Sequence, residues 1–247
     1  MNKLTEFLKE EQQAKRKGGL YHKTQVQLAY NSNRIEGSKL TEEQTRYIFE
    51  TRTIGFKDQE AVPVDDIIET SNHFIAFDDV LRTIDEPLTE DLIKGFHRTL
   101  KTGTADAQLS YFNVGDYKKL ANEVGGRETC MPAAVAMEMK SLQEWYNAQK
   151  NVTIHTLAEY HWRFECIHPF QDGNGRVGRL ILFRECLRNN IMPFVIDNEH
   201  KIYYYRGLSD FKQTPGFLVG TMQSAQDVYE AWIRYFNEEL LEGLKIE

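Results

Sequence analysis

The stretch that decides the fold is HPFQDGNGRVGR, residues 168–179. Its glycine-rich turn at 173–175 runs directly into a helix-forming and mostly apolar segment, residues 180–189. A tight turn that enters a helix leaves several backbone N–H groups without partners, and the positive end of the helix dipole points the same way. The sequence therefore predicts a phosphate site at this turn, in an enzyme or binder of a nucleoside polyphosphate.

Three side chains of this stretch add chemistry to the turn. His168 follows an apolar helical segment, and imidazole is the side chain that can accept a proton from a hydroxyl nucleophile near neutral pH. Asp172 would repel a phosphate unless a cation stood between them, so Mg²⁺ is the expected metal ion. Asn174 tolerates left-handed backbone and offers a side-chain amide donor between two glycines that let N–H groups approach an anion.

The stretch also carries two arginines at helical spacing. Arg176 and Arg179 are three residues apart, so they are neighbours on the first turn of the helix, and each could grip phosphate oxygens. Two cations at a helix N-terminus oppose the dipole unless an anion lies between them. This conflict favours a functional site over a solvated pair of arginines.

The whole stretch resembles the signature of the Fic family, His-x-Phe-x-Asp/Glu-Gly-Asn-Gly-Arg-x-x-Arg, and it matches every fixed position. The likeness extends from about residue 87 to residue 211. It implies an all-α fold, a Fic-type helical bundle with a short β-hairpin, the flap, beside the active site. It also implies an enzyme that transfers AMP from ATP to a hydroxyl side chain of a target protein and releases pyrophosphate.

The resemblance implies a role for each matched position. His168 would deprotonate the Ser, Thr or Tyr hydroxyl of the target, and Asp172 would hold Mg²⁺ across the α- and β-phosphates. The flap, about residues 116–131, would dock the target by strand pairing. The expected ATP contacts are Gly173, Asn174 and Gly175 as a phosphate cradle, Arg176 on the β-phosphate, Arg179 on the γ-phosphate, and Tyr204 and Tyr205 as weaker candidates for the adenine pocket.

A second motif lies upstream, in SNRIEG, residues 32–37. It resembles the inhibitory helix of many Fic proteins, Ser/Thr-x-x-x-Glu-Gly/Asn. Ser32 and Glu36 share one helical face, and Gly37 suits the position that ends a helix. The resemblance implies that Glu36 pairs with Arg179 and so competes with the γ-phosphate of ATP. The alternative is that Glu36 is an ordinary exposed carboxylate in a last helical turn.

The resemblance, together with helix ends marked by glycine, proline and capping residues, implies three parts. Residues 1–86 form an N-terminal helical extension with the inhibitory helix at about 24–37, residues 87–215 form the Fic core, and residues 216–247 form a C-terminal helix on that core. The expected helices include 24–36, 64–84, 90–100, 133–149, 153–166, 177–188, 203–211 and 225–244, with a capping box at 41–44 and a hairpin between 110 and 132.

Composition and net charge limit the classes of binding partner that we expect. The chain has 247 residues, a net charge of −7 and a pI of about 5.6, which argues against a general nucleic-acid binder. Three scattered cysteines indicate a reducing compartment, and no run is long and apolar enough for a membrane span, so we expect a cytoplasmic protein without membrane contact. Self-modification and a homodimer are both compatible with the resemblance.

Several alternatives stay open at this stage. Glu36 could take part in removing AMP from the modified protein, which would make the enzyme bifunctional. The donor could be another nucleotide or phosphocholine, or the reaction could be phosphorylation as in Doc toxins. A non-catalytic module that only senses nucleotide is the alternative from another class, although His168 and Asp172 are both intact.

Overall fold

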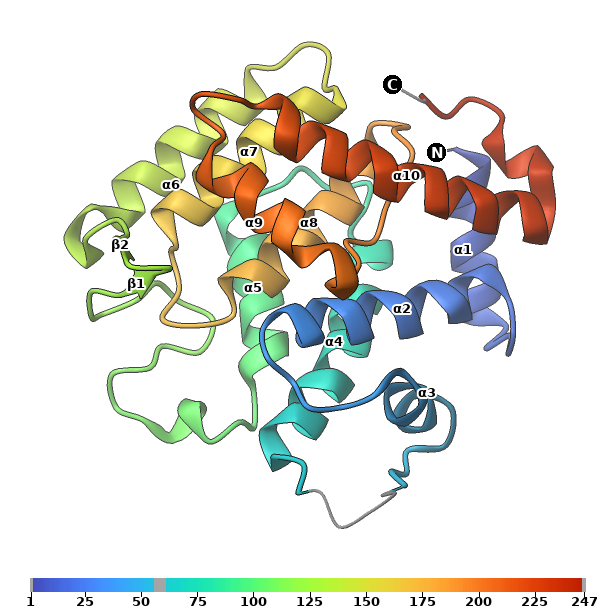
Figure 1. Ribbon diagram of the computed structural model, residues 1–247, viewed down its shortest axis with the longest axis horizontal. Helices are drawn as coiled ribbons and strands as arrows, with labels where there is room; N and C mark the ends of the chain where they lie inside the picture. The colour runs from blue at the N-terminus through green and yellow to red at the C-terminus, as the bar shows by residue number, and fades with distance from the viewer. Residues whose placement is uncertain (1, 56–60, 246–247) are drawn as a thin grey trace.

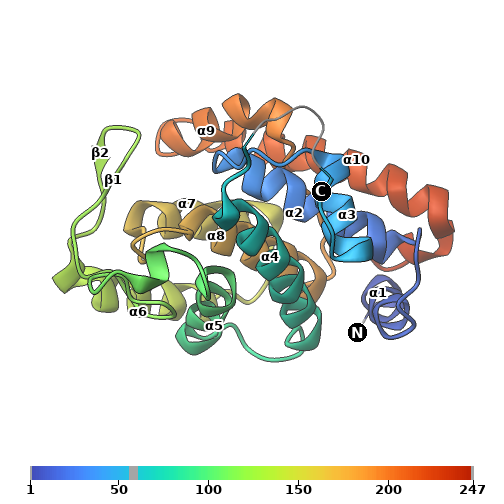
Figure 2. The same ribbon diagram turned by 90° about the horizontal axis from the view of Figure 1, so that it is seen from below.

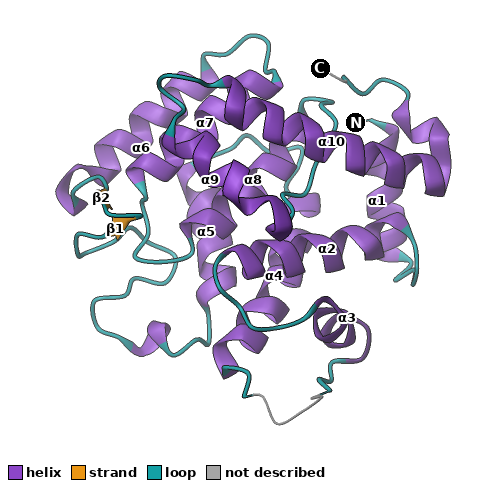
Figure 3. Cartoon of the chain, viewed as in Figure 1, coloured by secondary structure: helices purple, strands orange, loops and turns teal. Residues whose placement is uncertain are grey.

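The computed structural model describes residues 2–55 and 61–245. Residues 1, 56–60 and 246–247, which belong to the expected N-terminal extension and C-terminal segment, lie outside the described residues. The described chain is a bundle of helices with one two-stranded antiparallel sheet (Figure 1, Figure 3). No helix of this part is long and apolar enough to cross a membrane.

Among the described residues, helices α1 to α4 form the N-terminal part, and helix α5 and the hairpin of β1 and β2 follow. Their bounds are α1 Lys3–Gln13, α2 Leu20–Ile35, α3 Glu42–Thr51, α4 Val64–Arg82, α5 Glu90–Lys101, β1 Glu123–Val124 and β2 Arg127–Glu128. The remaining helices are α6 Pro132–Asn147, α7 Ile154–Ile167, α8 Asn174–Arg188, α9 Lys201–Ser209 and α10 Gly216–Asn237. Short 3₁₀ turns lie at Asp106–Gln108, Asn198–His200 and Glu238–Leu241.

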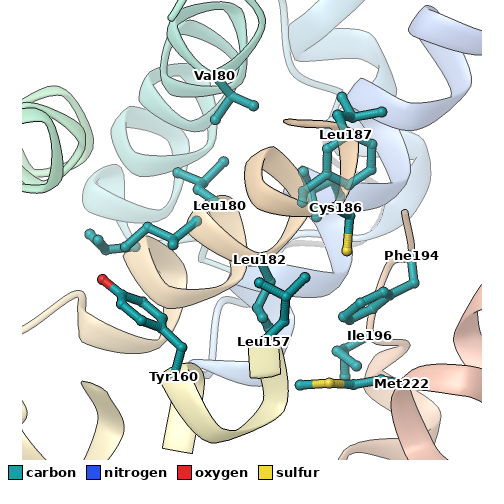
Figure 4. Packing of buried hydrophobic residues seen from close by; sticks show 14 of the residues in the cluster. Val80, Leu157, Tyr160, Leu180, Leu182, Cys186, Leu187, Phe194, Ile196 and Met222 are labelled. Atoms are coloured by element: carbon teal, nitrogen blue, oxygen red, sulfur yellow. The ribbon is translucent and has the colours of Figure 1, made fainter. Parts of the chain in front are cut away.

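Helix α8 is the central element of the bundle. Every residue from Asn174 to Leu187 is buried, and the helix contacts α2, α4, α5 and α7. Figure 4 shows its side chains Leu180, Leu182, Cys186 and Leu187 packed between residues of α4, α7 and α10. One continuous hydrophobic cluster runs from Leu4 to Leu240, so the core joins the N-terminal helices, the signature and α10.

Local sequence signals set most helix ends. Thr41 and Gln44 form the expected capping box of α3, and the Thr89 side chain accepts a hydrogen bond from Leu92 N–H at the start of α5. The hairpin turns at Gly125-Gly126, where both residues have positive φ. It projects away from the helices on the side of α6 and α7 (Figure 2).

Several expected helix boundaries were wrong. Helix α2 begins at Leu20 instead of residue 24, because the buried Glu11 carboxylate accepts Tyr21 N–H (2.8 Å) and so satisfies a donor of its first turn. Helix α8 begins at Asn174 instead of 177. Helix α4 ends at Arg82 instead of 84, and α10 spans Gly216–Asn237 instead of 225–244. Buried Leu218, Val219 and Met222 explain the early start of α10 despite its glycines.

Candidate active site

The loop between α7 and α8 is fixed by two residues with left-handed backbone. His168 ends α7 with φ 50°, and its N–H donates to Phe164 C=O (2.8 Å). Gly173 precedes α8 with φ 80°, a conformation that glycine adopts without steric cost. His168 therefore leaves the end of one helix and faces the start of the next.

Two hydrogen bonds inside the loop hold this geometry. Asn174 Oδ1 accepts Phe170 N–H (2.8 Å), and Asn174 Nδ2 donates to Phe170 C=O (2.9 Å). Phe170 is fully buried and stacks on His97 of α5, with ring centroids 4.0 Å apart and planes at 2°. The Asn174 side-chain amide is thus occupied by Phe170, and Gly173 takes the left-handed position that Asn174 would also tolerate.

Arg179 is bonded to the last turn of α2. Its Nη2 lies 2.6 Å from Glu36 Oε1 and donates to Ser32 C=O (2.9 Å), and its Nε donates to Ser32 Oγ (2.9 Å). The Arg179 residue is only 4% exposed. The contact expected between Glu36 and Arg179 is therefore present, and Ser32 supplies two further acceptors to the same guanidinium.

Glu36 reaches α8 because α2 ends beside a glycine of the signature. Glu36 is the C-cap of α2, followed by Gly37 at φ 100°, and Tyr205 Oη donates to Ile35 C=O (3.1 Å). A Cβ at Gly175 would lie 2.3 Å from Glu36 Oε1. Only glycine at this position lets the carboxylate approach the first turn of α8.

Arg176 points to a different carboxylate. It forms an ion pair with Glu69 of α4, and its Nη2 donates to Asp172 Oδ2 (3.0 Å). Lys101 Nζ of α5 donates to the same Asp172 oxygen (2.7 Å) and to Glu69 Oε1 (2.6 Å). Burial alone would raise the pKa of Asp172, but Arg176 and Lys101 outweigh it and hold that pKa below its usual value.

The arrangement encloses two cavities that meet at Glu36. The larger, about 630 Å³, is lined by Glu36, His168, Gly175 and Arg179, and it reaches the hairpin through Val124 and residues 127–129. A smaller cavity of about 220 Å³ lies between Glu36, Glu69, Asp172 and Arg176. One carboxylate from the N-terminal helices thus separates the base candidate from the metal-ligand candidate.

The two tyrosines proposed for the adenine pocket differ in position. Tyr204 and Tyr205 both line the larger cavity. Tyr204 is 1% exposed, its Oη lies 2.7 Å from His161 Nε2, and its ring centroid is 5.9 Å from Arg179 Cζ, so it packs behind that arginine. Tyr205 is 45% exposed and holds the end of α2. Their contact with adenine stays a prediction.

Sequence reasoning missed Glu69, Lys101 and Glu165. Lys101 and Asp172 are 71 positions apart, so no local pattern links them. Glu165 did leave a signal, because it lies three residues before His168 on the last turn of α7. Among the residues that the structure describes, no group of three His, Cys, Asp or Glu side chains is arranged to hold a metal ion alone.

Residues 87–185 match the Fic/DOC family. This matched stretch includes the signature at 168–179. A Fic-domain signaling protein from Bacteroides thetaiotaomicron has the same fold, with a TM-score of 0.71 and 23% identity over 98% of each chain. Fic-1 from C. elegans superposes with a TM-score of 0.68 and 22% identity, over 87% of this chain and 64% of that one. The expected Fic-type helical fold with a small hairpin is therefore confirmed.

A curated relative extends the similarity to a named activity. The protein adenylyltransferase Fic of Drosophila grimshawi is 27% identical over 215 residues, which cover 81% of this chain and 42% of that protein. The chain thus spans about two fifths of the length of the curated relatives that it matches. The chain is therefore a distant homologue of protein adenylyltransferases.

Proposed function

We propose that this protein transfers AMP from ATP to a hydroxyl side chain of a target protein, and that Glu36 inhibits the transfer. The observation that carries the proposal is that His168, the first turn of α8 and Arg179 all line one cavity of about 630 Å³ beside the hairpin. A base, a phosphate-binding helix start and a strand edge for an extended peptide are the parts that such a transfer needs.

In the proposed reaction the target hydroxyl oxygen attacks the α-phosphorus of ATP. A new O–P bond forms, the bond from the α-phosphorus to the bridging oxygen breaks, and pyrophosphate leaves with that oxygen. His168 accepts the hydroxyl proton. The backbone N–H groups at 173–175 and the guanidinium groups of Arg176 and Arg179 stabilise the phosphate charge.

The site residues fit a magnesium ion, which would neutralise phosphate charge when bound. Mg²⁺ prefers carboxylate oxygens and takes most of its remaining ligands from water and substrate phosphates, so one carboxylate is sufficient. Asp172 is that carboxylate, with its side chain 48% exposed. Its bonds to Lys101 and Arg176 keep it charged and mean that these cations must share it with the metal.

The inhibition follows from the occupied guanidinium. Glu36 and Ser32 take the Nε and Nη2 donors of Arg179, so these donors are not available to the γ-phosphate, and ATP would bind with its α-phosphate out of line. A bias of about 1.4 kcal/mol toward the closed arrangement is enough to lower the competent fraction about tenfold.

The test is transfer of radioactive label by the Glu36→Gly variant. We expect label from α-labelled ATP, and none from γ-labelled ATP, to appear on protein in a cell lysate or on the enzyme itself, at a rate at least tenfold above the parent. Adding His168→Ala should remove the activity, since loss of a general base costs about 10²–10⁴-fold. Label from γ-labelled ATP would instead indicate phosphorylation, and no label at all would leave a nucleotide-binding module.

A second candidate activity is removal of AMP from the modified protein. It is favoured by the position of Glu36, which lines the same cavity as His168 and keeps 32% of its side chain exposed, so that it can orient a water molecule. In this case the parent releases AMP from a modified target and Glu36→Gly does not. Release of AMP at equal rates by the two proteins would exclude the role.

A further inference from the structure

A carboxylate that the proposed mechanism does not use lies behind the base candidate. Glu165 precedes His168 by one turn at the end of α7, and Glu165 Oε2 is 3.7 Å from His168 Nδ1. The two side chains are 14% and 15% exposed. Within the described residues neither Glu165 Oε1 nor His168 Nδ1 has a hydrogen-bond partner, although both atoms are buried. A small rotation of the ring would bring the pair into hydrogen-bond contact.

The surroundings leave His168 as the partner for this carboxylate. His161 Nε2 is 4.0 Å from Glu165 Oε1, but it is bonded to Tyr204 Oη of α9, and burial lowers the pKa of His161 to about 4. His161 is therefore neutral at pH 7. Arg179 of α8 also faces this region, but Glu36 of α2 already pairs with it.

The carboxylate is ionised in this setting. Burial would raise the pKa of Glu165, but contact with His168, His161 and the field of Arg179 outweigh burial and lower that pKa. Helices α7 and α8 are so close at this point that Gly178 of α8 has no room for a side chain. A Cβ at Gly178 would lie 2.9 Å from Glu165 Oε1 and 2.7 Å from His161 Cε1.

We propose that Glu165 is a positioning residue that holds His168 by Nδ1 and leaves Nε2 to take the proton of the target hydroxyl. The inference rests on the proposed transfer. In the step, the hydroxyl proton moves to His168 Nε2 as the O–P bond forms and pyrophosphate leaves. Glu165 stays ionised and stabilises the imidazolium, which afterwards loses its proton to solvent. A buried carboxylate behind a catalytic imidazole fixes its tautomer in this way.

The experiment compares Glu165→Gln with its parent, both in the Glu36→Gly background. We expect kcat to fall about 10- to 100-fold, as for other groups that orient a reacting side chain, with little change in KM for ATP. The acidic limb of the kcat–pH profile should move to lower pH by about 1 unit or more, because the imidazolium loses its counter-ion. Glu165→Asp should restore part of the rate.

Glu159→Gln is the matched control, because Glu159 lies on the same helix, is 37% exposed and pairs only with Arg163 among the described residues. It should leave kcat and the pH profile unchanged. An unmoved acidic limb in Glu165→Gln, with or without a lower kcat, would overturn the inference, because a merely structural role lowers the rate without shifting the profile.

A second measurement separates this inference from the transfer itself. In NMR titration of the imidazole signals, the midpoint for His168 should move to lower pH in Glu165→Gln and stay in place in Glu159→Gln. An inactive Glu36→Gly parent would contradict the proposed transfer, whereas an unmoved His168 midpoint would contradict the pairing with Glu165 whatever the activity.

Discussion

Two carboxylates from the N-terminal helices each bond one arginine of α8, and their settings differ. Glu69 of α4 is 14% exposed and pairs with both Arg176 and Lys101, which are themselves 3% and 2% exposed. Glu36 lies at the end of α2, is 32% exposed, and forms its ion pair and hydrogen bond with Arg179. Both carboxylates line the smaller cavity, but Glu69 is shared by two cations, whereas Glu36 pairs with Arg179 and also lines the larger cavity.

The difference would separate a structural contact from the proposed inhibitory one. Removing a carboxylate that two buried cations share leaves both cations short of a partner, which is costly. Removing the more exposed carboxylate lets water or a phosphate replace it from the larger cavity. Both carboxylates lie outside residues 87–185, so the N-terminal helices supply the charges that balance the signature, whereas Phe170 and Asn174 fix its backbone from within.

The strongest test of this comparison is Glu69→Ala. We expect a loss of about 3–5 kcal/mol in the free energy of unfolding, because Arg176 and Lys101 would then share only Asp172 and Asp106 as buried or partly buried partners. Urea unfolding followed by circular dichroism measures it. Glu138→Ala, on an exposed face of α6, is the control and should change the stability by less than about 0.5 kcal/mol.

The free energy of unfolding should also depend on pH, through a buried histidine of α4. His73 lies one turn after Glu69 on α4, and burial together with Arg179 and Arg176 lowers its pKa to about 3. The unfolded histidine takes up its proton near pH 6.5, so its contribution to stability is complete above that pH and is lost as the pH falls toward 3. Over the first two units this loss is on the order of 2–3 kcal/mol.

The measurement is unfolding free energy between pH 7 and pH 4.5 for the parent and for His73→Leu. Both ring nitrogens of His73 lack hydrogen-bond partners within the described residues, so an apolar side chain of similar size should be tolerated. The variant should show a flatter dependence than the parent. His155→Gln, at an exposed position of α7, should leave the slope unchanged. An equal slope in His73→Leu would mean that this histidine does not titrate in the window.

The sequence predicted the parts of this site that are local. The turn from His168 to Gly175, the hairpin between residues 110 and 132 and the capping box at 41–44 rest on residues within a few positions of one another. The pairing of Glu36 with Arg179 spans 143 positions, and it was predictable only through the resemblance of both motifs to one family.

The rest depends on packing that no local pattern encodes. The start of α2 at Leu20 depends on Glu11 from another helix, and the ion pairs of Glu69 and Lys101 depend on how α4, α5 and α8 meet. The sequence did not predict that the Asn174 side chain is bonded within the loop, because a Gly-Asn-Gly turn is compatible with either residue taking the left-handed position. Its hydrogen bonds to Phe170 decide between them.

Replacing Glu36 should have a large effect on transfer and a small effect on stability, unlike replacing Glu69. Glu36→Ala should raise transfer at least tenfold and cost only about 1–2 kcal/mol of stability, since Arg179 keeps both bonds to Ser32. Initial rates with α-labelled ATP and urea unfolding of the same preparations measure the two effects. Glu138→Ala, on an exposed face of α6, should change neither quantity appreciably. A stability loss as large as that of Glu69→Ala would make Glu36 a second structural contact.

The smallest expected effect belongs to Ser32, which holds the same guanidinium from one turn earlier. Ser32 is fully buried, and Ser32→Ala removes one acceptor from Arg179 while the Ser32 carbonyl remains. The lost bond is worth about 1 kcal/mol, so transfer should rise by no more than about fivefold. Because Ser32 and Glu36 contact one side chain, their effects should not add. If the closed arrangement needs both contacts, the double variant Ser32→Ala/Glu36→Ala transfers AMP no faster than Glu36→Ala alone. Full additivity of the two rate increases would mean that Ser32 inhibits by a route independent of Arg179.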